Sequence, residues 1–205
     1  MKTLLKIQTS LLGSSGQSSQ LADRFADMWL ARNPGGRVIT RDLSADAIPH
    51  LTAERFQAFG TKSEERTPEQ DEIVAYSDEL IRELRDADTI VLAVPMYNFS
   101  VPSTLRAYFD HIARAGVTFR YSSSGPEGLI TGKQAVVFIT RAGIYADAAD
   151  TQSLYLRQFL GFIGIKDVEF VYAEGLGHGD DVRTKSLNTA RHTIAKMLTP
   201  ETIAA

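Results

Sequence analysis

Residues 89–99 read TIVLAVPMYNF, an apolar run that stops at a proline and gives way to two aromatic residues around an asparagine. An apolar run without alternation is typical of a strand that is buried on both faces of a sheet. Pro95 cannot continue a central strand, so Met96 to Phe99 are predicted to turn over the edge of the sheet. The stretch therefore predicts a buried strand followed by an aromatic loop.

Similar runs recur along the chain and alternate with amphipathic helical patterns. The predicted strands are 4–8, 37–43, 89–94, 134–140 and 168–173. The predicted helices are one with Leu21, Phe25, Met28 and Trp29 on a single face, then 68–84, 102–115, 153–164 and 180–197, whereas 44–67 shows no long period. Parallel strands need crossover connections, which are usually helical. The sequence thus predicts a doubly wound α/β fold in one domain, 1–205, with five parallel strands buried on both faces and helices on each side.

Composition restricts the classes of partner. The chain has 205 residues, of which 43% are hydrophobic and 23% charged, a net charge of −3 and no cysteine. Disulfides and cysteine nucleophiles are excluded, and the small, scattered charge does not favour nucleic acid or a membrane surface. No apolar run approaches the length of a membrane span, and the first residues lack the core of a signal peptide. We expect a cytoplasmic protein with small-molecule partners.

The first predicted strand runs into SLLGSSGQS (10–18), a loop of serine and glycine that opens directly into a helix. Free N–H groups and the positive end of the helix dipole favour an anion at such a place. The loop lacks the lysine of a nucleotide P-loop and the glycine spacing of a dinucleotide site. What remains is a set of hydroxyls and amides, which suits one terminal phosphate. The alternative is that these residues only cap the helix and turn the chain.

Two further loops should lie beside this one, because ligands in doubly wound sheets bind outside the carboxyl ends of the strands. Tyr97 and Phe99 could pack against a planar heterocycle, with Asn98 at its polar rim, although they could also be core aromatics at a turn. In the loop after strand 134–140, small Ala142 and Gly143 let the backbone approach a ligand closely. Together the loops predict a phosphate cradle, an aromatic wall and an amide-lined edge.

Several of these segments carry a family resemblance: PMYNF (95–99), the SLLGSSGQS loop, TFRY (118–121), GPEGL (125–129) with the following GK, and FLGFIG (159–164). Over nearly the whole length, the chain resembles the bacterial FMN-dependent NADH azoreductases and quinone reductases. The resemblance implies a flavodoxin-like fold and a homodimer with active sites at its interface. It also implies ping-pong transfer of hydride from NADH through tightly bound FMN to quinones and azo compounds, with NADPH as a second possible donor.

The resemblance also implies which residues serve the site. Tyr121 and Phe162 match positions that line the substrate pocket, and Tyr121 or Tyr145 is a candidate proton donor, solvent being the alternative. The residues expected to bind FMN are Ser10, Gly16, Gln17, Ser18, Pro95, Met96, Tyr97, Asn98, Phe99, Thr140, Arg141, Ala142 and Gly143.

The chain departs from the family pattern at three places. Gly16 stands where relatives often have serine, Ala142 where they have glycine, and Tyr145 where a histidine is common. The four histidines, His50, His111, His178 and His192, lack metal-ligand spacing, so no metal is expected. Two alternatives to a reductase remain open, namely an electron-carrying flavodoxin that binds FMN and a flavin-free regulatory domain on the same scaffold.

Overall fold

Strand β3 (Thr89–Pro95) is the central strand of the sheet, and all of its residues are buried. Its side chains alternate between two core clusters, so that Leu92 belongs to one cluster and Val91 to the other. A strand with a core on each side must be apolar at successive positions. This is the physical reason for the unbroken run in the sequence.

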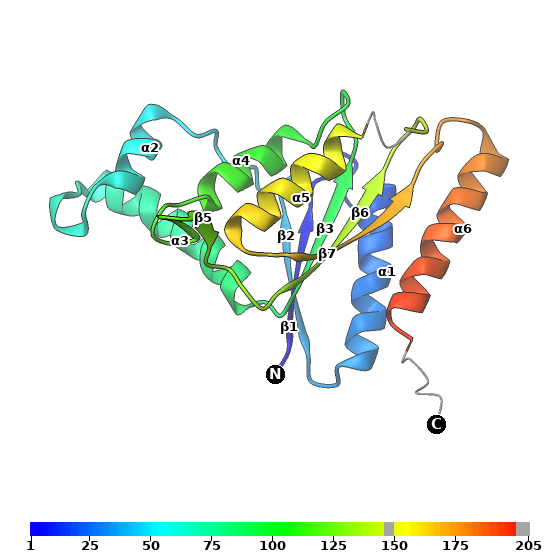
Figure 1. The fold of residues 1–205 in the computed structure, drawn as a ribbon. Coiled ribbons are helices and arrows are strands. Elements are labelled where there is room, and N and C mark those ends of the chain that lie inside the picture. Colours follow the sequence, from blue (N-terminus) through cyan, green and yellow to red (C-terminus); the bar gives the residue numbers. More distant parts are fainter. Residues whose placement is uncertain (146–149, 200–205) are drawn as a thin grey trace.

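The sheet has five parallel strands in the order β2–β1–β3–β6–β7 (Figure 1). The computed structural model describes residues 1–145 and 150–199. Besides β3, the strands are β1 (Thr3–Gln8), β2 (Arg37–Asp42), β6 (Gln134–Thr140) and β7 (Asp167–Ala173). From β1 the chain first moves outward to β2 and then crosses to β3 on the other side, so strand order reverses between β1 and β3. The doubly wound, flavodoxin-like fold class is confirmed, and this reversal is where such sheets bind ligands.

Helices cover both faces of the sheet (Figure 1). One face carries α1 (Gln17–Arg32) and α6 (Asp180–Met197), and the other carries α3 (Pro68–Asp86), α4 (Ser103–Ile112) and α5 (Thr151–Ile163). The two core clusters follow the same division, with Phe25 and Ile194 in one and Leu84, Phe109 and Leu160 in the other. Each cluster joins amphipathic helices to one face of the sheet, which is how the fold buries its apolar residues.

The two edge strands differ from the expectation that all five strands are buried on both faces. No residue of β2 is fully buried, and in β7 only Val171 and Ala173 are. An edge strand has a neighbour on one side only, and the flanking helices pack mainly over the central strands. The expectation was right for β1, β3 and β6 and wrong for the edges.

Two elements were not predicted. Residues 44–67 contain a short helix, α2 (Ala53–Gly60), whose N-terminus is capped by the Thr52 hydroxyl, and the segment after α4 contains an antiparallel hairpin of β4 (Phe119–Ser122) and β5 (Gly125–Gly128). Short 3₁₀ turns cover Gly13–Ser15 and Ser63–Glu65. A helix of two turns gives too little periodicity to be recognised, although its capping threonine was a usable signal.

Candidate functional site

The loop after β1 presents a set of hydrogen-bond donors at the N-terminus of α1. Gly16 is the N-cap residue and offers no side chain, and the first helical hydrogen bond runs from the N–H of Gln20 to the carbonyl of Gly16 over 3.0 Å. The N–H groups of residues 17–19 therefore have no helical acceptor. The hydroxyls of Ser18 and Ser19 are buried and, within the described residues, have no hydrogen-bond partner. Amides and hydroxyls without acceptors suit an anion.

Residue 16 is a glycine because its backbone lies directly against Ser10. A Cβ atom on Gly16 would lie 2.2 Å from Ser10 Oγ and 2.7 Å from Ser10 Cβ. Ser10 is buried, and its Oγ accepts a hydrogen bond from the N–H of Leu12 over 3.2 Å, which holds the start of the loop. The departure at Gly16 is therefore accommodated by a close approach of two loop segments, which a serine at that position would disturb.

The loop after β3 makes a tight turn that exposes an aromatic ring. Tyr97 and Ser100 exchange backbone hydrogen bonds of 3.1 and 3.0 Å, and between them Asn98 and Phe99 have φ angles of 48° and 63°. This left-handed conformation is rare for residues other than glycine, asparagine and aspartate, so at Phe99 it is strained. The ring of Phe99 is 71% exposed. The turn thus holds an apolar ring out of the core beside the serine loop.

The loop after β6 presents backbone amides. Its carbonyls at Arg141, Ala142 and Gly143 accept hydrogen bonds of 3.1, 2.9 and 2.8 Å from the N–H groups of 175–177, which fixes the loop from behind. In the described part of the chain, the N–H groups of Ala142 and Gly143 have no acceptor. The ring of Tyr145 lies over Gly143, where a Cβ atom would approach it to 3.2 Å. The loop therefore offers two donors next to an aromatic ring.

Hydrogen bonds tie the three loops together. The N–H of Met96 donates to the carbonyl of Thr140 over 2.9 Å, and the N–H of Leu11 donates to the Tyr97 hydroxyl over 3.1 Å. The predicted residues at 10–18, 95–99 and 140–143 are therefore brought to one edge of the sheet. Ser19 joins them as a buried hydroxyl that the sequence analysis did not single out, because serine at the start of a helix has many roles.

The side chain of Arg141 does not belong to the exposed part of this edge. Its guanidinium is buried and donates hydrogen bonds to Asp150, Gln152 and Glu174. Burial alone would raise the pKa of Asp150, but hydrogen bonds from Ser153 and Arg141 outweigh it and hold this pKa below its ordinary value. The backbone of Arg141 is also engaged, because its N–H donates to the carbonyl of Ala173 over 3.0 Å and its carbonyl accepts from the N–H of Leu176 over 3.1 Å. Asp150, Gln152 and Glu174 were not singled out in the sequence, because nothing in their spacing joins them.

Tyr121 and Phe162 are not brought to this edge within one chain. Phe162 lies near the end of α5, whereas the first residue of that helix, Thr151, donates a hydrogen bond to the carbonyl of Phe99 over 2.8 Å. Eleven residues of helix separate the two positions, or about 16 Å along the axis. Tyr121 is 76% exposed on the β4–β5 hairpin, which packs at the Phe162 end (Figure 1).

A mostly apolar hollow of about 550 Å³ adjoins Tyr121. It is lined by Leu51, Phe56, Phe59, Gly60, Asp110, Ala113, Arg114, Ala115, Phe119 and Tyr121. Aromatic residues from α2 and from the hairpin thus share one concave surface. Such a surface can accept planar apolar groups, but it lies away from the three loops of its own chain.

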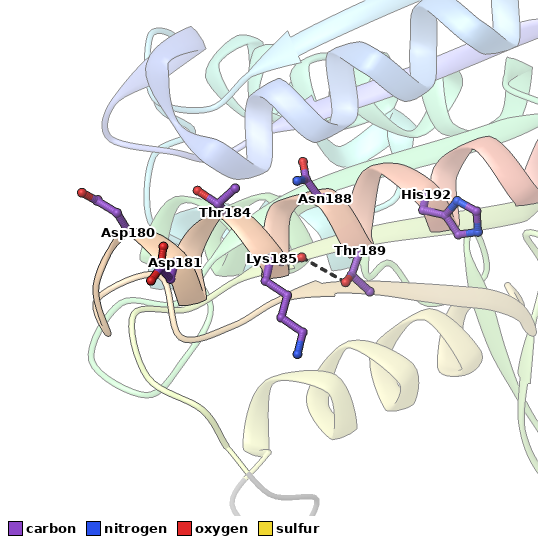
Figure 2. Close-up of a pocket in the computed structure, with 7 residues that line it drawn as sticks. All are labelled: Asp180, Asp181, Thr184, Lys185, Asn188, Thr189 and His192. Atoms are coloured by element: carbon purple, nitrogen blue, oxygen red, sulfur yellow. Dashed lines mark hydrogen bonds between the residues drawn. The ribbon is translucent and has the colours of Figure 1, made fainter.

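A larger hollow, of about 630 Å³, runs along α6 and is formed by that helix alone (Figure 2). Its lining residues, Asp180, Asp181, Thr184, Lys185, Asn188, Thr189 and His192, are all exposed. None of them comes from a strand end, and none is buried without a partner. We therefore do not assign it as the functional site.

No group of three or more histidine, aspartate or glutamate side chains is placed to hold a metal ion between residues 1 and 145 or 150 and 199. Across the same residues, no helix combines the length and the apolar character needed to cross a membrane.

Comparisons with known proteins agree on family and fold. Residues 1–198 match the family described as having a flavodoxin-like fold. The chain is 52% identical over 195 residues to an FMN-dependent NADH:quinone oxidoreductase of Cellvibrio japonicus (strain Ueda107), covering 95% of this chain and 97% of that protein. It is 49% identical over 199 residues to the FMN-dependent NADH:quinone oxidoreductase of Yersinia pestis (strain Pestoides F), covering 97% and 99%. The crystal structure of an azoreductase from Bacillus anthracis str. Sterne superposes with a TM-score of 0.88 at 25% identity, covering 97% and 99%.

Proposed function

The chain belongs to the flavodoxin-like fold family, and from that premise we propose that it is an FMN-dependent NADH:quinone oxidoreductase that also reduces azo compounds. The observation that carries the proposal is the donor set at the start of α1, where buried serine hydroxyls and free amides lack an acceptor. Relatives with about half of their residues identical are named for this cofactor and this donor.

The residues present fit FMN. Its terminal phosphate would be held by the amides of residues 17–19 and the hydroxyls of Ser10 and Ser18, and Gly16 lets its own backbone lie against Ser10. The ring system would lie against the turn at 95–99, with Asn98 at its polar rim and the amides of Ala142 and Gly143 along its other edge. The amides of residues 17–19, 142 and 143 and the hydroxyl of Ser18 have no hydrogen-bond partner among the described residues. The Oγ of Ser10 accepts from the N–H of Leu12 and keeps its own proton to donate.

The chemistry proposed is a ping-pong reaction in which FMN, when bound, carries a hydride equivalent from NADH to a second substrate. A quinone takes two electrons and two protons to give the hydroquinone, at the cost of one NADH and one proton. An azo bond needs two such cycles, in which two NADH and two protons give two amines. The protein's part is to bind each substrate in turn in the same space and to exclude water from it.

The protein also stabilises negative charge and supplies an orienting wall. The free amides of Ala142 and Gly143 can donate hydrogen bonds to charge that develops at the cofactor's edge, as preorganised backbone donors do in other enzymes. We assign no dedicated proton donor, since water can deliver the protons. Tyr145 is the tyrosine placed beside the proposed ring site, whereas Tyr121 is separated from it within one chain.

We further propose that the enzyme is a homodimer with shared sites. Support comes from the separation of Tyr121 and Phe162 from the three loops of their own chain. It also comes from exposed apolar side chains around both regions, Leu11, Leu12, Phe99, Ile144 and Leu154 near the loops and Phe56 and Tyr121 near the hollow. A second copy that brought its aromatic hollow over the first copy's loops would cover both.

An enzyme supplied with NADH would work in the cytoplasm.

An anaerobic titration tests the proposed function. Protein reconstituted with FMN is titrated with NADH while the visible flavin absorbance is followed, and a quinone or an azo dye is then added. Bleaching followed by recovery is the expected result. A flavin band that neither NADH nor NADPH bleaches would favour the electron carrier, and a protein that binds no FMN would overturn the proposal.

Mixing two inactive variants tests the shared site. Gly16→Ala damages only the cofactor loops, and Tyr121→Ala damages only the hollow. If sites are shared across a dimer, half of the randomly mixed dimers contain one intact site, so about a quarter of the wild-type activity returns. If each chain builds its own site, mixing restores nothing.

A further inference from the structure

The buried side chain of Arg141 is the centre of a cluster of polar and aromatic side chains. The side chain of Arg141 is 1% exposed, and it donates hydrogen bonds to Glu174 over 2.9 Å, to Gln152 over 3.2 Å and also to Asp150. Its guanidinium carbon lies 5.5 Å from the ring centroids of both Tyr145 and Tyr172. Burying a charge is expensive unless it is paired and hydrogen-bonded, and here both requirements are met.

Through Gln152 the cluster reaches the aromatic loop. The Gln152 side chain accepts from Arg141 and, through its own Nε2, donates to the carbonyl of Pro95 over 3.2 Å. The next residue back, Thr151, holds the carbonyl of Phe99 over 2.8 Å. A chain of hydrogen bonds therefore runs from Arg141 through Gln152 to Pro95, and the neighbouring Thr151 holds the other end of the turn at Phe99.

The cluster also places charge next to the proposed ring site. Arg141 begins the loop whose free amides belong to Ala142 and Gly143, and Tyr145, which contacts the guanidinium, lies over Gly143 and meets Phe99 edge-on at 6.3 Å. Within the described residues the cluster holds one positive and two negative side chains. These three side chains together carry one net negative charge and are largely shielded from water, where charges act over longer distances.

We propose that Arg141 is a positioning residue that joins the loops after β3 and β6, and that the charge balance of Arg141 with Asp150 and Glu174 sets the midpoint potential of bound FMN. The inference rests on the proposed function. A net negative charge beside the ring disfavours the reduced, more negative form of the flavin. Removing a carboxylate should therefore raise the midpoint potential, and removing the guanidinium should lower it.

Four variants separate geometry from charge. Arg141→Lys keeps the positive charge but cannot reach Gln152, Asp150 and Glu174 together, because a lysine lacks the planar fork. Arg141→Gln removes the charge as well. Asp150→Asn keeps an acceptor for the N–H of Ser153 at the start of α5 while removing a negative charge. Glu174→Gln removes the other negative charge at a side chain that is 24% exposed, where folding is safest.

The measurements are the dissociation constant of FMN, by quenching of its fluorescence, and the midpoint potential of the bound flavin, by equilibration with a reference dye. For Arg141→Lys we expect FMN affinity to fall about tenfold with little change in potential. For Arg141→Gln we expect a similar loss and a lower potential, and for Asp150→Asn and Glu174→Gln a higher potential. A loosening of the packing would not depend on the sign of the charge that is removed. Shifts of the midpoint potential in opposite directions would therefore indicate an electrostatic effect.

Arg41→Gln is the matched control. Arg41 is also a largely buried arginine with several carboxylate partners, but it lies on edge strand β2, and its partners Glu79 and Glu83 lie on α3. The Arg41→Gln protein should be less stable than wild type but should have the same midpoint potential of bound FMN. Potentials that do not move, or that move in the same direction in the arginine and carboxylate variants, would overturn the inference. Wild-type protein that binds no FMN would instead overturn the proposed function.

Discussion

The phenol oxygen of Tyr97 accepts a hydrogen bond from the backbone N–H of Leu11 over 3.1 Å, and so joins the aromatic loop after β3 to the serine loop after β1. Both loops are proposed to hold one FMN, the first at its ring and the second at its phosphate. Their relative position therefore decides whether one ligand can satisfy both.

Tyr97→Phe should weaken FMN binding without unfolding the protein. The change removes one hydrogen bond between neutral groups, which is worth about 1 kcal/mol, or roughly a fivefold rise in the dissociation constant. Fluorescence titration of the apoprotein with FMN measures it. Tyr76→Phe, which removes a hydroxyl from a half-buried tyrosine of α3, is the control and should bind FMN normally. Equal affinity in Tyr97→Phe and wild type would show that the tie is not needed.

Phe99→Gly should make the apoprotein more stable and the enzyme worse. Phe99 has φ 63° and is exposed, so glycine relieves about 1 kcal/mol of backbone strain and loses little buried area. Urea unfolding of the apoprotein reports the gain, and quinone reduction reports the loss of the aromatic surface. Asn98→Gly is the control for stability: it should gain less than Phe99→Gly, because asparagine tolerates this conformation. If the Phe99→Gly apoprotein unfolds at a lower urea concentration than wild type, the conformation of Phe99 does not cost the predicted strain energy.

The sequence carried enough information for the sheet but not for the whole site. Strand β3 could be predicted because burial on both faces leaves an apolar run, and the loops after β1, β3 and β6 followed because parallel strands end at one edge. The helix α2 was missed because its eight residues give little periodicity. The fold class thus depends on local patterns that a single chain displays openly.

The parts that could not be predicted depend on contacts between distant segments. The resemblance implied that Arg141 contacts the cofactor, but nothing in the sequence indicated its partners Asp150 and Glu174, which are brought to it only by the packing of α5 and β7. Likewise, no spacing indicates that the length of α5 separates Phe162 from Phe99. Such distances follow from three-dimensional packing, which the pattern of one segment does not encode.

Gly128→Ala should displace the hairpin that carries Tyr121. A Cβ atom there would lie 2.1 Å from the backbone nitrogen of Gly164 and 2.3 Å from the carbonyl carbon of Ile163, so the backbones must separate. Overpacking of this kind costs about 1–3 kcal/mol. We expect a higher KM for the quinone with an unchanged dissociation constant for FMN, measured by steady-state kinetics and fluorescence. Ser123→Ala, in the exposed turn of the same hairpin, should leave both values as they are. Lost FMN binding in Gly128→Ala would contradict the separation of the two regions.

Stability should fall below about neutral pH because of His111, which is completely buried in α4. Its Nδ1 pairs with the carbonyl of Ala107 over 2.9 Å, and its Nε2 has no partner in the described residues, so a second proton would find no acceptor. Burial accordingly lowers the pKa of His111 from its ordinary value of 6.5. A group whose pKa is lower in the folded state contributes stability that is complete above the unfolded value and is lost as the pH falls through the folded value.

His111→Phe should therefore remove part of this pH dependence, since a phenyl ring can pack between Phe59 and Tyr76, the neighbours of the imidazole, and does not titrate. Urea unfolding at several pH values between 7.5 and 5, a range that brackets the ordinary histidine pKa, measures the slope for wild type and variant. Charged groups close to the ring, Arg55, Asp110 and Arg114, remain in both proteins, so the difference isolates the imidazole. His192→Gln, at an exposed histidine of α6, is the control and should keep the wild-type slope. Parallel slopes for His111→Phe and wild type would mean that His111 does not take up a proton when the protein unfolds in this range.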